Sequence, residues 1–406
     1  MAPDERNAPD RCPGVLTVHQ AADGGLARVR LPGGVLTPAQ LRVLTAASVE
    51  LGDGNLELTS RANVQIRALR AGAPQELSER LYAAGLLPSI THERVRNILA
   101  SPLSGLDQHS LYDVLPVVGE LDRLLCAHSG LASLPGRFLF AVDDGRGDLA
   151  AVGADVAVRM VSPDQATLLL AGTNTGVLLS PAEIAPTMLA ATEAFLAERT
   201  GQSSSAWRLS ELPNGPANVL ARLGLHQKKA PQAPMGWGGL EAGRYEQADG
   251  KSALVVTVPL GSLSAGQAGV LAGLGEQAAG ELRVARSRSI VVPGVRAVDQ
   301  AVERLAGVGL VVEAGSPWDG VTACAGRPGC GKALADVRGD ARRVTPGLPG
   351  RHRAVHWSGC ERRCGQPAGE FVDVLALTDG YSIDGSPAVT IDLRMLSTAL
   401  RPRRSS

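Results

Sequence analysis

Cysteines are the residues whose types and spacing most clearly indicate chemistry. The chain of 406 residues has six cysteines, and four of them fall in one short stretch. Cys324 and Cys330 form a C-x5-C motif, and Cys360 and Cys364 form a C-x3-C motif. Four thiolates on two loops can hold one [4Fe–4S] cube, because each sulfur binds one iron. We therefore expect these four residues to bind a [4Fe–4S] cluster.

A disulfide scaffold and a zinc site both fit the cysteine spacing less well than an iron–sulfur cluster does. Six cysteines in a chain of this length are too few for a disulfide scaffold. Structural zinc usually binds cysteines separated by about two to four residues, and C-x5-C is longer than that. Glycine and proline near the motifs, such as Gly359 and Pro367, would let backbone N–H groups approach the cluster sulfides. We interpret Cys12 and Cys126, which have no partner at metal-binding spacing, as ordinary thiols.

The elements that must position these residues repeat along the chain. In residues 26–102, a short strand leads to Thr37 and Gln40, which predict a helix that begins with a capping box. In residues 254–324, Ser264 and Gln267 predict the same cap after a β-rich run. Two strands and a second helix follow in each segment. We interpret this pattern as an internal duplication of a β-α-β-β-α-type unit.

Each repeated unit is followed by an α/β segment. The first segment has predicted strands at 138–143 and 166–171 and a predicted helix that begins after Ser180. The second has the cysteine motifs and predicted strands at 371–377 and 388–393. Residues 227–239 are the best candidate for a linker between the halves. The sequence thus predicts two half-domains, at residues 12–90 and 240–312, each followed by an α/β domain, at residues 91–226 and 313–400.

Composition excludes several classes of partner. Lysine plus arginine and aspartate plus glutamate both number 40, so the formal net charge is +0 and a nucleic-acid partner is not expected. No stretch approaches the ~18 apolar residues of a membrane span, and the first residues contain no apolar targeting segment. We therefore expect a cytoplasmic protein with no membrane partner. The chain has no Gly-rich dinucleotide fingerprint, which indicates an external electron donor.

The cysteine motifs resemble those of the sulfite and nitrite reductase superfamily, in which the last cysteine also bridges the cluster to a sirohaem iron. Residues 59–65 resemble the family's T-x-R-x-x-x-Q segment, residues 94–102 its R-N-x-x-x-x-P segment, and residues 134–139 its L-P-R-K-F-K segment. The resemblance covers residues 12–393. It implies an α+β fold, with pseudo-two-fold duplicated ferredoxin-like units plus two α/β nitrite/sulfite reductase-like 4Fe-4S domains.

The chain is also similar to a shorter branch of this superfamily, the precorrin-3B synthases of aerobic cobalamin biosynthesis. The similarity lies in length, in Arg-Val-Arg-Asn-Ile-Leu-Ala-Ser-Pro at 94–102, and in Leu-Pro-Gly-Arg-Phe at 134–138. It implies a monooxygenase that hydroxylates precorrin-3A at C20 with O2, followed by lactone formation. It also implies a mononuclear non-haem iron beside the [4Fe–4S] cluster, and electrons from an NAD(P)H-dependent reductase or a ferredoxin.

The family motifs nominate further site residues. The resemblance implies that Arg61, Arg96 and Arg137 bind the carboxylates of a tetrapyrrole, because arginine pairs with carboxylates in bidentate fashion. It places Gln65 and Asn97 at the cofactor. Weaker candidates are Arg286 and Arg288, which lie where the second unit matches residues 60–62. For the mononuclear iron no ligand set is evident, although His92 and His109 flank the Arg96 motif.

Two alternative functions remain open at this point. One is a sirohaem-dependent sulfite or nitrite reductase that takes electrons from ferredoxin or NAD(P)H. Apolar Leu139 stands where that family has its second lysine, which weakens this alternative because reduction of a small anion needs cations near the iron. The other is a non-catalytic carrier of electrons or tetrapyrrole, which would not need a set of arginines.

Overall fold

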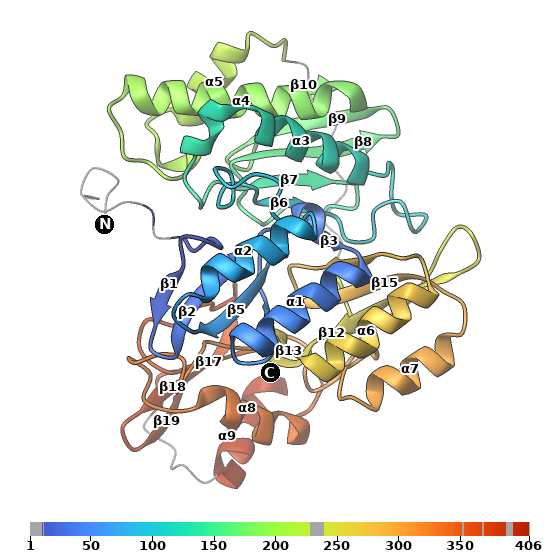
Figure 1. Ribbon diagram of the computed structural model, residues 1–406, viewed down its shortest axis with the longest axis vertical. Helices are drawn as coiled ribbons and strands as arrows, with labels where there is room; N and C mark the ends of the chain where they lie inside the picture. Colours follow the sequence, from blue (N-terminus) through green and yellow to red (C-terminus); the bar gives the residue numbers. More distant parts are fainter. Residues whose placement is uncertain are drawn as a thin grey trace.

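The protein has a mixed α+β fold, seen here in a computed structural model (Figure 1). The structure describes residues 10, 12–227, 239–350, 353–367, 369–386 and 393–405. These residues form four β-sheets. In Figure 1, one sheet with α3, α4 and α5 lies at the top, two sheets covered by α1, α2, α6 and α7 lie in the middle, and one sheet with α8 and α9 lies at the bottom.

The two middle sheets have matching strand orders, β1-β2-β5-β4-β13 and β11-β12-β15-β14-β3. The strands and helices of the first unit are β1 (His19–Ala21), β2 (Gly24–Val29), β3 (Val35–Leu36), α1 (Pro38–Leu51), β4 (Asn55–Leu58), β5 (Val64–Leu69) and α2 (Ala73–Ala83). Those of the second unit are β11 (Gly243–Glu246), β12 (Ser252–Thr257), β13 (Ser262–Ser264), α6 (Ala265–Gln277), β14 (Leu282–Val284), β15 (Ser289–Val295) and α7 (Val298–Ala306).

The two units exchange their short strands. Strand β13 of the second unit pairs with β4, with Leu263 opposite Leu56, and β3 of the first unit pairs with β14, with Leu36 opposite Leu282. One hydrophobic core runs through both sheets and their helices. Residues 12–90 and 240–312 were expected as two half-domains, and each completes its sheet with a strand from the other.

The helices α1 and α6 begin where the sequence predicts. Both have complete capping boxes, between Thr37 and Gln40 in α1 and between Ser264 and Gln267 in α6. Each glutamine side chain also donates a hydrogen bond to a distant carbonyl. Gln40 Nε2 lies 3.0 Å from the oxygen of Ala84, and Gln267 Nε2 lies 3.0 Å from the oxygen of Val308. The caps therefore fix both the helix starts and the chain that leaves the second helix of each unit.

The third sheet has the order β10-β9-β8-β7-β6 and its own hydrophobic core, which includes Phe138, Phe140 and Phe195. Its elements are β6 (Ile98–Ala100), α3 (Leu115–Ala127), β7 (Phe140–Asp143), β8 (Val156–Ser162), β9 (Gln165–Leu170), β10 (Thr173–Leu179), α4 (Pro181–Gly201) and α5 (Gly215–Leu223). The expected strands at 138–143 and 166–171 and the helix after Ser180 are confirmed as β7, β9 and α4.

The fourth sheet has the order β16-β17-β18-β19 and packs around Trp357 and Tyr381, whose rings meet edge to face. Its elements are β16 (Val321–Ala323), α8 (Val337–Val344), β17 (Ala354–Ser358), β18 (Phe371–Leu377), β19 (Gly380–Ile383) and α9 (Leu393–Ser405). The strand expected at 371–377 is confirmed. The linker expected at 227–239 lies almost wholly outside the described residues, as does the strand expected at 388–393.

Candidate functional site

The two cysteine motifs meet at one edge of the fourth sheet. Cys324 directly follows β16, and Cys360 comes two residues after β17. These strands are neighbours and run parallel, with Ala323 opposite Trp357. Because parallel strands end at the same edge of a sheet, the loops that follow them lie side by side. Leu334 N donates to the oxygen of Gly359 at 2.8 Å and ties the two loops together.

The geometry of these loops fits a metal cluster. Gly359 N donates to Cys324 Sγ at 3.1 Å, as a backbone donor to a thiolate would. A Cβ at Gly359 would lie 2.7 Å from Ala333 Cβ, so only glycine fits this position. Burial raises the pKa of the Cys364 thiol, and so do the thiols of Cys324, Cys360 and Cys330. The thiols of Cys324, Cys330 and Cys360 therefore lie near that of Cys364, and four cysteine thiolates are the donor set that a [4Fe–4S] cube requires.

Buried ion pairs join the Cys324 loop to the first middle sheet. Arg338 Nε donates to the oxygen of Cys324 at 3.1 Å, and its Nη1 pairs with Glu57. Arg67 pairs with Asp23 through Nε at 3.1 Å and donates to the oxygen of Gly329 at 2.7 Å. The loop that carries Cys324 and Cys330 is thus held by side chains from β4 and β5.

The two remaining cysteines have other surroundings. Cys12 Sγ accepts hydrogen bonds from Arg28 Nη1 at 3.4 Å and Arg30 Nη2 at 3.3 Å. Arg30 is 2% exposed, and burial is the main reason that its pKa falls to about 9. Cys126 is half-buried, and burial raises the pKa of its thiol.

A cavity of about 770 Å³ lies beside the cysteine loops. All four sheets contribute to its wall, which includes residues 365–367 directly after Cys364. Its size falls in the usual range of small-molecule sites, roughly 300–1,000 Å³. The charged side chains that line it are Arg61, Asp148, Glu241, Arg286, Arg288, Asp319, Arg353 and Glu370.

Equivalent turns of the two units place arginines in this cavity. The turn between β4 and β5 carries Arg61, and the turn between β14 and β15 carries Arg286 and Arg288. Both turns close with the same hydrogen bonds, from Ala62 N to the oxygen of Thr59 and from Arg288 N to the oxygen of Ala285. The residue at the donor position has a positive φ in both, 54° for Ala62 and 61° for Arg288.

Arg61 and Arg288 are available to bind an anion. Neither guanidinium has a hydrogen bond or ion pair within the described part of the chain. Burial lowers the pKa of both, and a nearby cation, Arg208 for Arg61 and Arg338 for Arg288, lowers it further. A Cβ at Gly365 would lie 3.7 Å from Arg288 Nη2, so this guanidinium lies next to the Cys364 loop. An anionic ligand would relieve the repulsion between each of these half-buried guanidinium groups and its neighbouring cation.

Arg96 and Asn97, expected in the site, do not line the cavity. Arg96 instead forms a buried bidentate ion pair with Asp122 of α3, with both N–O distances at 2.7 Å. Asn97 is 1% exposed, and its Nδ2 donates to the oxygens of Arg94 and Gly136. Arg96 therefore ties the segment at 94–102 to α3, and Asn97 ties it to the segment at 134–139.

Arg137 and Gln65 also lie outside the cavity lining. Arg137 is exposed and stacks over the ring of Trp207, with its Cζ 4.9 Å from the ring centroid. Gln65 lies in β5, opposite Arg28 and Glu57 in the neighbouring strands. Leu139, two residues after Arg137, is buried and does line the cavity.

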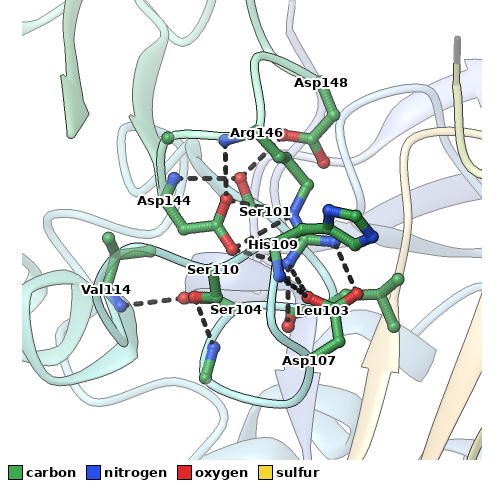
Figure 2. Close-up of polar contacts among 12 residues, drawn as sticks. Ser101, Leu103, Ser104, Asp107, His109, Ser110, Val114, Asp144, Arg146 and Asp148 are labelled. Atoms are coloured by element: carbon green, nitrogen blue, oxygen red, sulfur yellow. Dashed lines mark hydrogen bonds and ion pairs between the residues drawn. The ribbon is translucent and has the colours of Figure 1, made fainter. Parts of the chain in front are cut away.

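Asp148 is a cavity residue that the sequence did not reveal. It lies in an acid-rich loop, Asp-Asp-Gly-Arg-Gly-Asp at 143–148, that follows β7. Its Oδ1 accepts a hydrogen bond from Ser101 Oγ at 2.7 Å (Figure 2). Burial, and secondarily the charge of Asp143, raises the pKa of Asp148 to about 7. The repeated acids of this loop were the available signal, although acidic loops are common on protein surfaces.

The described residues contain one group of carboxylates close enough to share a metal ion, formed by Asp143, Asp144 and Asp148 within 4.8 Å. Two of them are already engaged. Asp143 accepts hydrogen bonds from three backbone N–H groups, and Asp144 pairs with Arg146 at 2.8 Å.

The histidines considered as iron ligands lie elsewhere. His92 is buried, and both of its ring nitrogens are hydrogen-bonded. His109 is exposed and lies outside the cavity lining.

Known proteins resemble this chain in sequence and fold. The family model for the nitrite/sulfite reductase ferredoxin-like half domain matches residues 19–84. A precorrin-3B synthase from Sinorhizobium sp. is 26% identical, over 96% of this chain and 86% of its own length. The chloroplastic ferredoxin–nitrite reductase of Spinacia oleracea is 25% identical, over 84% of this chain and 64% of its own length.

The expected resemblance is confirmed. The structure of the Mycobacterium tuberculosis NirA protein matches with a TM-score of 0.73 at 21% identity, over 91% of this chain and 75% of that chain. The chain therefore has a mixed α+β fold with ferredoxin-like sheets, similar to that structure, and its relatives are enzymes. Among the described residues, no helix is both long and apolar enough to cross a membrane.

Proposed function

We propose that this protein is a precorrin-3B synthase, an O2-dependent monooxygenase that hydroxylates precorrin-3A at C20 and forms a lactone. The observation that carries the proposal is the cavity, in which Arg61 and Arg288 have no partner among the described residues and lie near the loop after Cys364. A precorrin carries many carboxylates, and half-buried guanidinium groups that face a cavity are suited to bind them. The similarity to a precorrin-3B synthase over 96% of the chain agrees with this substrate.

In this proposal, Cys324, Cys330, Cys360 and Cys364 would hold a [4Fe–4S] cluster, which would supply single-electron transfer beside the cavity. The electrons come from an external donor, such as a ferredoxin or an NAD(P)H-dependent reductase. Hydroxylation also requires an iron at which O2 can react, and the mononuclear iron implied by the resemblance would supply it. The first and second units, at 12–90 and 240–312, are in this view duplicated halves, followed by α/β domains at 91–226 and 313–400.

A sirohaem-dependent nitrite or sulfite reductase is the second candidate, because nitrite reductases are also similar to this chain. Leu139 argues against it. This side chain is 3% exposed, lines the cavity and stands where the resemblance places a lysine. An apolar wall does not stabilise a small anion that is being reduced, but it suits the ring of a larger substrate.

An absorption spectrum and two turnover assays separate the candidates. We expect protein purified without oxygen to show a broad iron–sulfur spectrum without sirohaem bands, and to convert precorrin-3A only when O2 and a reductant are added. Strong sirohaem bands with nitrite- or sulfite-dependent turnover would overturn the proposal. Arg61→Met should weaken precorrin binding, whereas the matched variant Arg159→Met, in β8 and outside the lining of this cavity, should not.

A further inference from the structure

The loop at 143–148 directs one of its three carboxyl groups into the cavity. Asp143 Oδ1 accepts Gly145 N at 2.9 Å and Gly147 N at 3.0 Å, which folds the loop back on itself. Asp144 and Asp107 both pair with Arg146, whose side chain is 1% exposed. The first two acids of the loop are therefore engaged within the protein, as Figure 2 shows for Asp144.

Asp148 remains available to a ligand. It is the one acid of this loop that lines the cavity. Ser101, directly after β6, is fully buried and donates a hydrogen bond to Asp148 Oδ1, while its oxygen accepts a hydrogen bond from Asp144 N at 3.1 Å. Because β6 and β7 are parallel neighbours, their carboxyl ends bring Ser101 and the acidic loop together. Within the described chain, Asp148 Oδ2 has no hydrogen-bond partner.

We propose that Asp148 is the proton-transfer residue of the cavity. In the hydroxylation, on which this role rests, one atom of O2 enters the substrate and the other leaves as water. That reduction takes two electrons from the external donor and two protons. Asp148 delivers one proton, and solvent water supplies the other. The O–H bond of Asp148 breaks, an O–H bond to the departing oxygen forms, and water later reprotonates the carboxylate.

The charges around Asp148 suit this role. Asp143 and Asp144 lie on its own loop and favour the protonated acid, whereas Arg146 and the Ser101 hydroxyl favour the carboxylate. Arg61 lies in the same cavity wall, on the β4–β5 turn, and Arg286 and Arg288 come from the β14–β15 turn. With a pKa of about 7, the group exchanges its proton readily near neutral pH.

Infrared spectroscopy of the full chain tests the titration without turnover. We expect the wild-type protein to show a protonated-carboxyl band that disappears with a midpoint near pH 7. The band should be absent from Asp148→Asn and retained in Asp164→Asn, a control in the exposed β8–β9 turn. Ser101→Ala should move the midpoint upward, because it removes a donor to the charged form. A midpoint near pH 4, or an unchanged band in Asp148→Asn, would overturn the assignment.

Single-turnover rates with precorrin-3A, O2 and a reductant test the transfer itself. The wild-type rate should fall as pH rises through about 7, and Asp148→Asn should be roughly 100-fold slower with no such inflection. An Asp148→Asn protein with wild-type rate and pH profile would refute the role. If the wild-type protein converts no precorrin-3A, the proposed function fails. The role of Asp148 is then decided by comparing the rates of nitrite reduction of Asp148→Asn and of the control Asp164→Asn.

Discussion

The contrasting surroundings of Arg61 and Arg96 give a sharp test of which arginine binds the substrate. Arg96 makes two hydrogen bonds of 2.7 Å to Asp122, and the two side chains are 6% and 17% exposed. Its Nη1 also donates to the oxygen of Leu86 at 3.3 Å. Arg61 has no such partner in the described chain and lines the cavity. We expect Arg96→Met to affect mainly folding and Arg61→Met to affect mainly binding.

The magnitudes follow from the geometry. Breaking a buried ion pair costs roughly 3–5 kcal/mol, because a charge is left unpaired. Asp122 is partly open to water, so Arg96→Met should lower the free energy of unfolding by about 3 kcal/mol. Arg61→Met removes a half-buried cation that has no partner among the described residues, and it should change stability by less than about 1 kcal/mol. It should weaken tetrapyrrole binding about 10- to 100-fold, as expected for the loss of a charged hydrogen bond.

Urea unfolding and fluorescence titration with a porphyrin carboxylate measure the two effects. The double variant Arg96→Met with Asp122→Leu should recover much of the lost stability, because it leaves no unpaired charge. The outcome that refutes the reasoning is an Arg96→Met protein with wild-type stability and weakened binding. Such a protein would mean that Arg96 leaves Asp122 to bind the substrate.

Three further predictions concern the cysteines, the strand exchange and the acidic loop. Cys360→Ser should lose most bound iron and sulfide, whereas Cys126→Ser should keep both; equal contents would refute the ligand assignment. Gly34→Ala should destabilise the protein far more than Gly54→Ala. Both glycines have a positive φ, but a Cβ at Gly34 would lie 2.0 Å from the oxygen of Val284, whereas a Cβ at Gly54 would have no neighbour within 4 Å. Equal unfolding midpoints would contradict the pairing of β3 with β14. Because the pKa of Asp148 is raised from 3.8 to about 7, the free energy of unfolding of the wild-type protein should fall by up to about 4 kcal/mol as pH rises through that interval. Asp148→Asn should not show this loss. Parallel pH profiles of stability for the two proteins would count against the raised pKa.

Local sequence was sufficient for the elements whose signals are local. The capping boxes at Thr37 and Ser264 mark α1 and α6, because cap and partner lie within one helical turn. The cysteine spacing indicated a cluster site because two short loops carry all four thiols. The position of that site at the ends of β16 and β17 depends on their parallel pairing, which the sequence did not specify.

The sequence by itself determined which residues could do chemistry, namely four clustered cysteines and the arginines in the family motifs. It also revealed two repeated units. The tertiary structure decided which of them share a site. Arg61 reaches the cavity, while Arg96 pairs with Asp122 and Arg137 stacks on Trp207. The tertiary structure also places Asp148 in the wall of the cavity and pairs β3 and β13 each with the other unit's sheet. The reason is physical: the charge state and the partner of a side chain depend on burial and on residues distant in sequence, which only the folded chain brings together.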